Sequence, residues 1–204
     1  MTVKLVWATS DAEKQILYMT RVSSPHQDSN DTRLLKYLIN HQHWSPFEMA
    51  NMCVEVITSR DVSAQILRHR SFTFQEFSQR YAKVVDIVST EPRRQDDKNR
   101  QSSHDDLDAE TKNWWMQVST DIEERAKTYY QIALNKGIAK ESARRILPMA
   151  IETKLYMNGT LRSWIHYFSV RCTPETQLEH REIALQIREV FSQQFPVIAE
   201  VLYE

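Results

Sequence analysis

The chain has 204 residues, 41% of them hydrophobic and 26% charged, and its formal net charge is −1. This length and composition predict one globular domain, 1–204, with a sizeable core, and the near-zero charge argues against a nucleic-acid partner. The two glycines, Gly137 and Gly159, exclude the glycine-rich loops that bind dinucleotides or phosphates, so any nucleotide has to be held by side chains and helix N-termini.

The sequence also argues against a membrane protein and a metal site. No apolar run is long enough to span a bilayer, and the N-terminus lacks the features of a signal peptide, so we expect a cytoplasmic protein. Cys53 and Cys172 belong to no motif and are predicted to be free thiols. His41 and His43 lack further ligands nearby, which favours a pair at a helix end over a metal site.

The first half of the chain is predicted to mix strands and helices. Strands are expected at 3–7 and 51–58, where β-forming residues dominate, and within 72–88. Helices are expected after Ser10 as N-cap, at 32–40 before the break at Ser45-Pro46, and at 61–69.

The second half is predicted to be mainly helical. Residues 91–112 carry dense charge and one aliphatic residue, Leu107, and are expected to form a long solvated loop. Helices are expected at 114–135, ended by Gly137, and at 140–147 and 161–169. A last helix is expected to begin at Thr173-Pro174, with threonine as N-cap and proline at the first helical position. The whole is a helix-rich α+β domain with a small central β-sheet.

The segment 65–81 is the densest in residues that carry chemistry. Arg68, His69 and Arg70 place three potential cations in a row, which suits an anionic ligand or a solvated basic turn. Glu76, Ser78 and Arg80 alternate, so in a strand they would share one face. That face would offer an acceptor, a hydroxyl and a guanidinium to a nucleotide base and phosphate.

The spacing of these residues resembles a family signature. Arg68-His69-Arg70, then seven residues, then Ser78, is similar to the RHR-x7-S motif of the flavin-dependent thymidylate synthases. Four other segments agree with that family in its order, and together they span about residues 20 to 190. They are Arg21-Val22-Ser23, the HWSPFE segment at 43–48, the ESARRILP segment at 141–148, and the block from Thr160 to Glu179.

The resemblance implies a homotetrameric enzyme with active sites between subunits. It implies the reductive methylation of dUMP to dTMP, with FAD as cofactor and with NADPH and methylene-tetrahydrofolate as co-substrates. In this chemistry the cofactor carries the hydride and the protein contributes positioning and electrostatics. Cys172 follows Arg171 but lacks the Pro-Cys context of the cysteine-dependent synthases, so it is rejected as the nucleophile.

The resemblance also implies roles for individual residues. Catalysis is assigned to Ser78, Arg171 and His43. Binding of dUMP is assigned to Gln65, Arg68, Glu76, Phe77, Ser78, Gln79, Arg80, Arg144 and Arg171. Binding of FAD is assigned to Ser23, Ser45, Glu48, Arg68, His69, Arg70, Ser71, Thr160, Arg162 and His166.

The chain departs from the family pattern at four positions in these segments. Met49, Gln75, Thr160 and His166 stand where histidine, asparagine, asparagine and asparagine are common, and all but Met49 can hydrogen-bond. Two other functions stay open at this point. One is a non-enzymatic RNA- or nucleotide-binding module that uses the RHR segment for phosphates. The other is a flavoprotein that acts on a different pyrimidine nucleotide.

Overall fold

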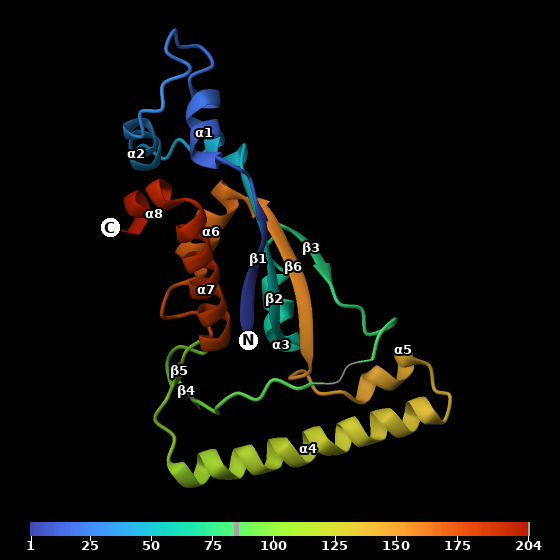
Figure 1. The fold of residues 1–204 in the computed structure, drawn as a ribbon. Helices are drawn as coiled ribbons and strands as arrows, with labels where there is room; N and C mark the ends of the chain where they lie inside the picture. The colour runs from blue at the N-terminus through green and yellow to red at the C-terminus, as the bar shows by residue number, and fades with distance from the viewer. Residues whose placement is uncertain (84–85, 204) are drawn as a thin grey trace.

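The computed structural model describes residues 1–83 and 86–203, and its centre is a four-stranded antiparallel sheet (Figure 1). The strands are β1 (Thr2–Ala8), β2 (Asn51–Ser59), β3 (Thr73–Glu76) and β6 (Glu152–Thr160), in the order β1-β2-β6-β3. Strands β2 and β6 pair along their whole length, from Asn51 opposite Thr160 to Ser59 opposite Glu152. Because β2 is apolar and almost wholly buried, it forms the middle of the domain.

Helices cover one face of this sheet. Among them, α6 (Leu161–Arg171), α7 (Leu178–Gln194) and α8 (Pro196–Tyr203) lie beside one another, and α7 packs against β1, β2 and α3 (Figure 1). Trp164 and Tyr167 of α6 are fully buried, and Phe168 of the same helix packs edge-on against Phe191 of α7, with ring centroids 5.3 Å apart. Helices α1 (Ala12–Thr20) and α2 (Arg33–Asn40) close one end of the core.

The longest helix, α4 (Ala109–Asn135), lies crosswise below the sheet and apart from it, and Tyr130 is the one residue of this helix that is buried (Figure 1). Asp108 caps its start by accepting from the backbone N–H of Thr111 at 2.8 Å. Its end was predicted correctly: Gly137 follows the last turn with φ +81°, a conformation that favours glycine. The helix begins inside the segment predicted as loop, so the boundary at residue 112 was wrong.

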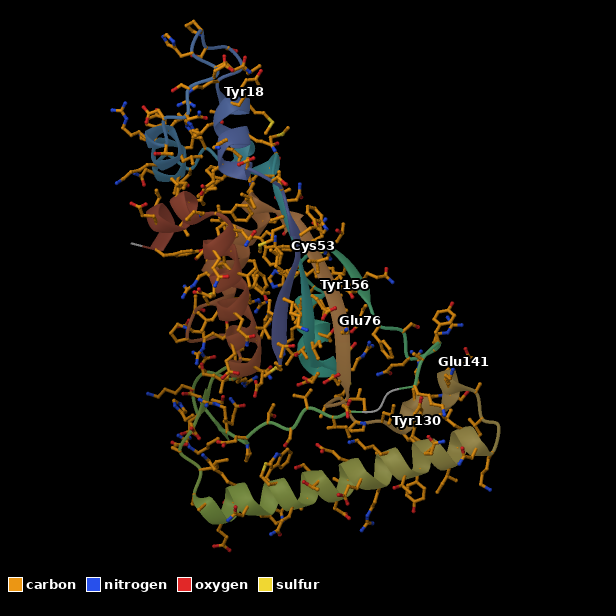
Figure 2. All side chains as sticks on the ribbon, viewed as in Figure 1. Tyr18, Cys53, Glu76, Tyr130, Glu141 and Tyr156 are labelled. Carbon is orange, nitrogen blue, oxygen red and sulfur yellow. The ribbon has the colours of Figure 1, made fainter. Side chains whose placement is uncertain are left out.

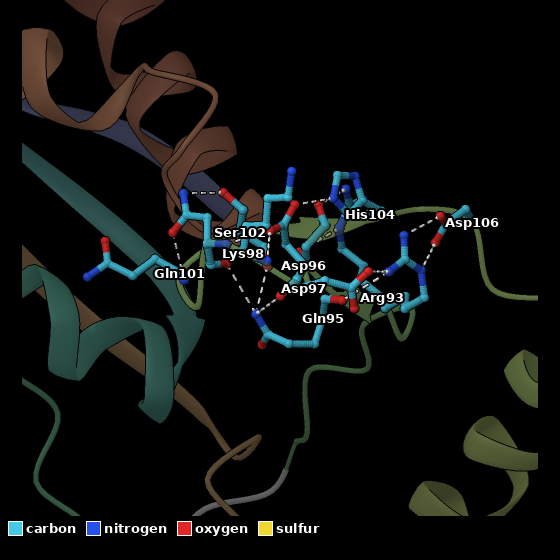
Figure 3. A network of polar contacts seen from close by, with 12 residues as sticks. Arg93, Gln95, Asp96, Asp97, Lys98, Gln101, Ser102, His104 and Asp106 are labelled. Carbon is cyan, nitrogen blue, oxygen red and sulfur yellow. Dashed lines mark hydrogen bonds and ion pairs between the residues drawn. The ribbon is translucent and has the colours of Figure 1, made fainter.

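The charged segment also contains more structure than predicted. Strands β4 (Arg94–Gln95) and β5 (Ser103–His104) form a small antiparallel hairpin (Figure 3). Arg94 donates to Asp106 through Nε at 2.9 Å and Nη2 at 2.7 Å, and His104 Nε2 lies 2.6 Å from Asp96 Oδ2. Opposite charges in the sequence therefore pair within the hairpin instead of staying fully solvated.

Most predicted elements are present, with α3 at Arg60–Ile66, and α5 at Lys140–Ala143 and η2 at Arg144–Ile146 in place of one helix at 140–147. The short helix η1 (Ser45–Glu48) forms at the predicted break and was not itself predicted. Two predicted caps were wrong. The N-cap of α1 is Asp11, and α7 begins at Leu178 with Gln177 as N-cap, well after Thr173-Pro174. Strand β6 and helix α8 were not predicted, and residues 84 and 85 of the strand-containing stretch lie outside the described residues. In the described chain no helix is long and apolar enough to cross a membrane.

Candidate active site

The first part of the signature, residues 68–72, forms the turn between α3 and β3, which we call the signature turn. Arg68 and Arg70 are exposed there, whereas His69 is half-buried between them. The turn is held by the N–H of His69, which donates to the carbonyl of Ile66 at 3.1 Å. Two cations are therefore presented to solvent while the imidazole faces the protein.

His69 is joined to the end of α6. Arg171 Nε donates to His69 Nε2 at 2.9 Å, although the two residues are 102 positions apart in the chain. Burial, with help from the Arg171 and His166 charges, lowers the pKa of His69 to about 4. Of the three potential cations in a row, His69 is therefore neutral at neutral pH. Because its Nε2 accepts from Arg171, its proton is on Nδ1.

A cavity of about 630 Å³ lies beside this junction. Its wall is formed by Trp44, Glu48, Ser71, Arg162, Ser163, Ile165, His166 and Ser169. Arg162 forms an ion pair with Glu48, and the Ser163 hydroxyl donates to the Ser71 carbonyl at 3.1 Å. Three segments that are far apart in sequence, 44–48, the signature turn and the first turns of α6, therefore share one wall.

Thr160 is the N-cap of α6. Its Oγ1 accepts from the backbone N–H of Ser163 at 3.2 Å, as an N-cap does, and contacts the Ser163 hydroxyl at 3.1 Å. Thr160 thus orients the helix turn that carries Arg162 and Ser163, and it does not itself line the cavity.

Glu76 lies at the end of β3, and its carboxylate is held by three side chains (Figure 2). Its Oε2 pairs with Arg60 Nη1 at 2.9 Å, and its Oε1 accepts from the hydroxyls of Ser63 at 2.6 Å and Thr153 at 3.1 Å. Strand β3 ends at Glu76, and the chain turns before Arg80. The expectation that Glu76, Ser78 and Arg80 share one strand face was therefore wrong.

Ser78 and Arg80 lie in the turn after β3, next to α5. Arg80 Nη2 is 3.4 Å from a carboxylate oxygen of Glu141, and Lys140 Nζ donates to the Tyr81 carbonyl at 2.8 Å. The ion pair between Arg80 and Glu141 brings the 141–148 segment to the end of the signature. Glu141 and Glu76 lie at separate places in the domain (Figure 2). A second cavity of about 530 Å³ opens between Arg80 and the junction of α4 with α5.

Gln79 and Ser78 differ in how their polar atoms are satisfied. Gln79 is buried, and within the described residues its Nε2 has no hydrogen-bond partner. Ser78 Oγ accepts from the Arg80 N–H at 3.4 Å, and no imidazole or carboxylate bonds to it in the described part of the chain. A serine without a paired base is a weak nucleophile, whereas a buried amide donor without a partner indicates a site for an acceptor.

Other predicted residues lie outside the first cavity wall. Ser23 is exposed in the turn after α1, and Ser45 is exposed at the start of η1. His43 is exposed after α2, with its ring 6.1 Å from that of His41, which is the helix C-cap. The helix-end interpretation of this pair is confirmed, and over the residues that the structure describes no group of three metal-binding side chains occurs.

Several residues of the site were not singled out from the sequence. Trp44 and Ile165 supply the apolar part of the cavity wall, and both stand next to residues that the motifs did select. His180 of α7 is fully buried and bonds to Tyr167 and Gln65. No sequence signal marks it, because it occupies the apolar stripe that continues with Ile183 and Ile187.

Neither thiol is activated by its surroundings. Burial raises the pKa of Cys53, which lies in β2, and burial outweighs the Arg188 charge to raise the pKa of Cys172. Both cysteines therefore stay protonated and free, in agreement with the sequence prediction.

The fold and the site have clear counterparts among known proteins. A model of the family described as thymidylate synthase complementing protein matches residues 4–197. A flavin-dependent thymidylate synthase of Synechocystis sp. is 53% identical over 191 residues, which are 93% of this chain and 89% of that protein. The chain belongs to the flavin-dependent thymidylate synthase family. The chain is thus an enzyme of the flavoprotein methyltransferase class.

One further relative and one solved structure extend the comparison. A probable flavin-dependent thymidylate synthase of Paramecium bursaria Chlorella virus 1 is 46% identical over 206 residues, 99% of this chain and 95% of that protein. The solved structure of a UMP/dUMP methylase, PolB from Streptomyces cacaoi, bound with 5-Br dUMP, has a TM-score of 0.84 at 27% identity. The match covers 98% of this chain and 93% of the PolB chain, and this likeness confirms the predicted α+β fold.

Proposed function

We propose that the chain converts dUMP to dTMP, with methylene-tetrahydrofolate as the carbon donor, FAD as the hydride carrier and NADPH as the reductant. The observation that carries the proposal is the hydrogen bond from Arg171 to His69, which locks the signature turn to α6 beside the 630 Å³ cavity. The family membership and the nucleotide named for the PolB structure support the same assignment.

The cavity fits a flavin by its size and its donors. Its volume lies within the roughly 300–1,000 Å³ that is usual for ligand pockets. Trp44 and Ile165 offer apolar surface for a planar ring, and Arg162, His166 and Ser71 offer donors for hydroxyl and phosphate oxygens. When bound there, FAD would supply hydride chemistry. The proposed FAD residues are Ser23, Ser45, Glu48, Arg68, His69, Arg70, Ser71, Thr160, Arg162 and His166.

The proposed dUMP site extends from Arg171 to the turn after β3. Arg171 uses Nε for His69, and within residues 1–83 and 86–203 its two terminal nitrogens make no hydrogen bond, so they could donate to a carbonyl or phosphate oxygen. Nε2 of buried Gln79, which has no partner among the described residues, offers a further donor. The other residues proposed to hold dUMP are Gln65, Arg68, Glu76, Phe77, Ser78, Arg80 and Arg144. Glu76 would act through Arg60 and Ser63, which it already orients.

The proposed role of the protein is positioning and charge stabilisation. Arg171 would stabilise the negative charge that develops on a uracil carbonyl, because a charge-assisted donor gains strength in a water-poor site. Neutral His69 would keep the Arg171 side chain oriented without adding a second positive charge. Ser78 would bind and orient the base and would not attack it. His43 remains a proposed catalytic residue that the geometry of one chain leaves outside the cavity.

We also propose that the working form is a homotetramer. Helix α4 presents large exposed side chains, among them Trp114, which is 58% exposed, and Tyr129, which is 62% exposed. Exposed aromatic residues along one extended helix are typical of a surface that another chain covers. Sites between subunits would also let Ser23 and Ser45 reach a neighbouring cavity. Light scattering that gives a stable and active monomer would contradict this.

An omission series tests the proposed reaction. Purified protein is incubated with dUMP, methylene-tetrahydrofolate, FAD and NADPH, and nucleotides are separated by chromatography. We expect dTMP only when dUMP, methylene-tetrahydrofolate and NADPH are all present and FAD is bound or added, and no dTMP in the complete mixture would refute the proposal. Since PolB is named as acting on UMP and dUMP, UMP is assayed in parallel. Methylation of UMP in preference to dUMP would support the other pyrimidine nucleotide as substrate.

A further inference from the structure

A series of hydrogen bonds runs from the core toward the proposed substrate site through His180. The hydroxyl of Tyr167 on α6 and Nε2 of His180 on α7 are 3.0 Å apart, and both side chains are fully buried. On the other side of the ring, Nδ1 of His180 lies 3.4 Å from Oε1 of Gln65, in the last turn of α3. One imidazole thus connects three helices.

The direction of these bonds follows from the donor and acceptor types. Gln65 Oε1 can only accept, so His180 Nδ1 carries a proton. Burial, with the Arg171 and His69 charges, lowers the pKa of His180, so the ring is neutral and Nε2 accepts from the Tyr167 hydroxyl. Gln65 Nε2 in turn donates to Gln177 Oε1 at 2.6 Å. Every bond therefore points from the core outward.

The orientation of the Gln65 amide and the proton on His180 Nδ1 belong together, and in the structure the amide presents Oε1 to the ring. If the amide were reversed, its amino group would face the Nδ1–H of His180, and two donors would oppose each other. In the observed orientation the amino group points away from the core, and one of its two N–H bonds is used by Gln177. The other N–H is available to an acceptor on a ligand.

We propose that His180 is a positioning residue for the pyrimidine nucleotide, which it serves by holding the Gln65 amino group toward a substrate oxygen. The inference rests on the proposed function, because that function places Gln65 in the dUMP site. With Tyr167 as its single partner, His180 would leave its Nδ1–H unpaired in the core. The contact with Gln65 supplies the missing acceptor and couples the core to the signature turn, since Gln65 precedes Arg68 by one turn.

A mutant cycle in FAD-loaded protein tests this role. His180→Leu should raise the Kd and the KM for dUMP roughly 3- to 10-fold, the effect of one hydrogen bond, while kcat and the Kd for FAD change by less than about two-fold. Gln65→Ala should weaken dUMP binding similarly. In the Gln65→Ala background, His180→Leu should add less than about two-fold, because the group it positions is gone.

A second variant separates positioning from stability. His180→Leu leaves the buried Tyr167 hydroxyl without an acceptor, so Tyr167→Phe/His180→Leu should regain much of the lost thermal stability. It should still bind dUMP weakly. Recovery of dUMP affinity together with stability would overturn the proposal, as would an unchanged dUMP affinity in Gln65→Ala.

A tautomer measurement is independent of the reaction. Protein with 15N-labelled histidine, in which His180→Leu identifies the resonances, should show a protonated Nδ1 and a bare Nε2 at position 180. The opposite tautomer would overturn the proposal. A wild-type protein that makes no dTMP would instead count against the proposed function, and the tautomer would still decide how the Gln65 amide is held.

Discussion

Replacing Gly159 by alanine should damage the flavin site through one aromatic ring. A Cβ at this position would lie 2.5 Å from Cε1 and 3.3 Å from Cγ of Phe72. Carbon atoms pack at about 3.5–4.0 Å, so the ring would have to retreat by roughly 1 Å. It has little room to do so, because its other neighbours include the Trp164 ring at a centroid distance of 4.6 Å, and Trp164 is fully buried.

The expected cost is about 1–3 kcal/mol of folding free energy, the usual range for overpacking a dense core. Phe72 follows Ser71, and its N–H donates to the His69 carbonyl at 3.3 Å, so the displaced ring should carry the signature turn with it. We therefore expect Gly159→Ala to lower the urea midpoint and to weaken FAD binding in the fraction that remains folded.

Gly137→Ala is the matched control. Its Cβ would meet nothing within 4 Å, but its φ of +81° makes alanine strained there. This change should cost about 1 kcal/mol of stability and leave the Kd for FAD unaltered. The reasoning about Phe72 is refuted if the two variants lose equal stability and both bind FAD as the wild type does.

Three further predictions concern the site residues. Arg171→Ala should weaken dUMP binding by roughly 1.5–3 kcal/mol and FAD binding far less, as measured by calorimetry; equal losses would indicate misfolding instead. Ser78→Ala should lower but not abolish dTMP formation, and Ser78→Cys should give no rate gain, because a gain would reveal an attacking group. Stability should fall as the pH drops below about 6.5, the unfolded-state pKa, because His180 and His69 have folded-state pKa values of about 3 and 4 and the unfolded chain binds more protons. At about pH 5, buried His180 alone should cost about 2 kcal/mol relative to about pH 7.5, and a flat urea midpoint across this range would contradict it.

Local sequence patterns were sufficient to predict the elements that have a clear signal of their own. Strand β2 is recognisable from its run of β-forming residues, and α4 and its end at Gly137 from its length and the glycine. Strand β6 was missed because Asn158 and Gly159 weaken its β-propensity. Its pairing with β2, about 100 residues away, supplies what the local sequence lacks.

The start of α7 shows how tertiary contacts override a good local signal. Thr173-Pro174 fits a helix start, but Thr176 Oγ1 donates to the Val170 carbonyl at 3.2 Å and Arg181 Nη1 donates to the Pro174 carbonyl at 3.2 Å. These bonds keep 173–176 as a turn on the end of α6. Helix α7 can therefore begin only at Leu178.

The site was predictable where it coincides with a motif and unpredictable where it depends on packing. The signature turn, Glu48 and Arg162 were chosen because the chain resembles the family at these segments, and the structure brings them to one side of the domain. The neutral state of His69 could not be read from its two arginine neighbours, because it follows from burial and from Arg171. In the same way, His180 acquires its partners only when α3, α6 and α7 meet.

The central claim is that uracil methylation here depends on flavin and not on a protein thiol. Its most direct test is tritium release from 5-tritiated dUMP by the Cys53→Ala/Cys172→Ala protein, with methylene-tetrahydrofolate, NADPH and FAD. Because burial keeps both thiols protonated, we predict release within about two-fold of the wild type, dependent on added or bound FAD. A folded, FAD-loaded double variant that releases no tritium, beside an active wild type, would contradict the account.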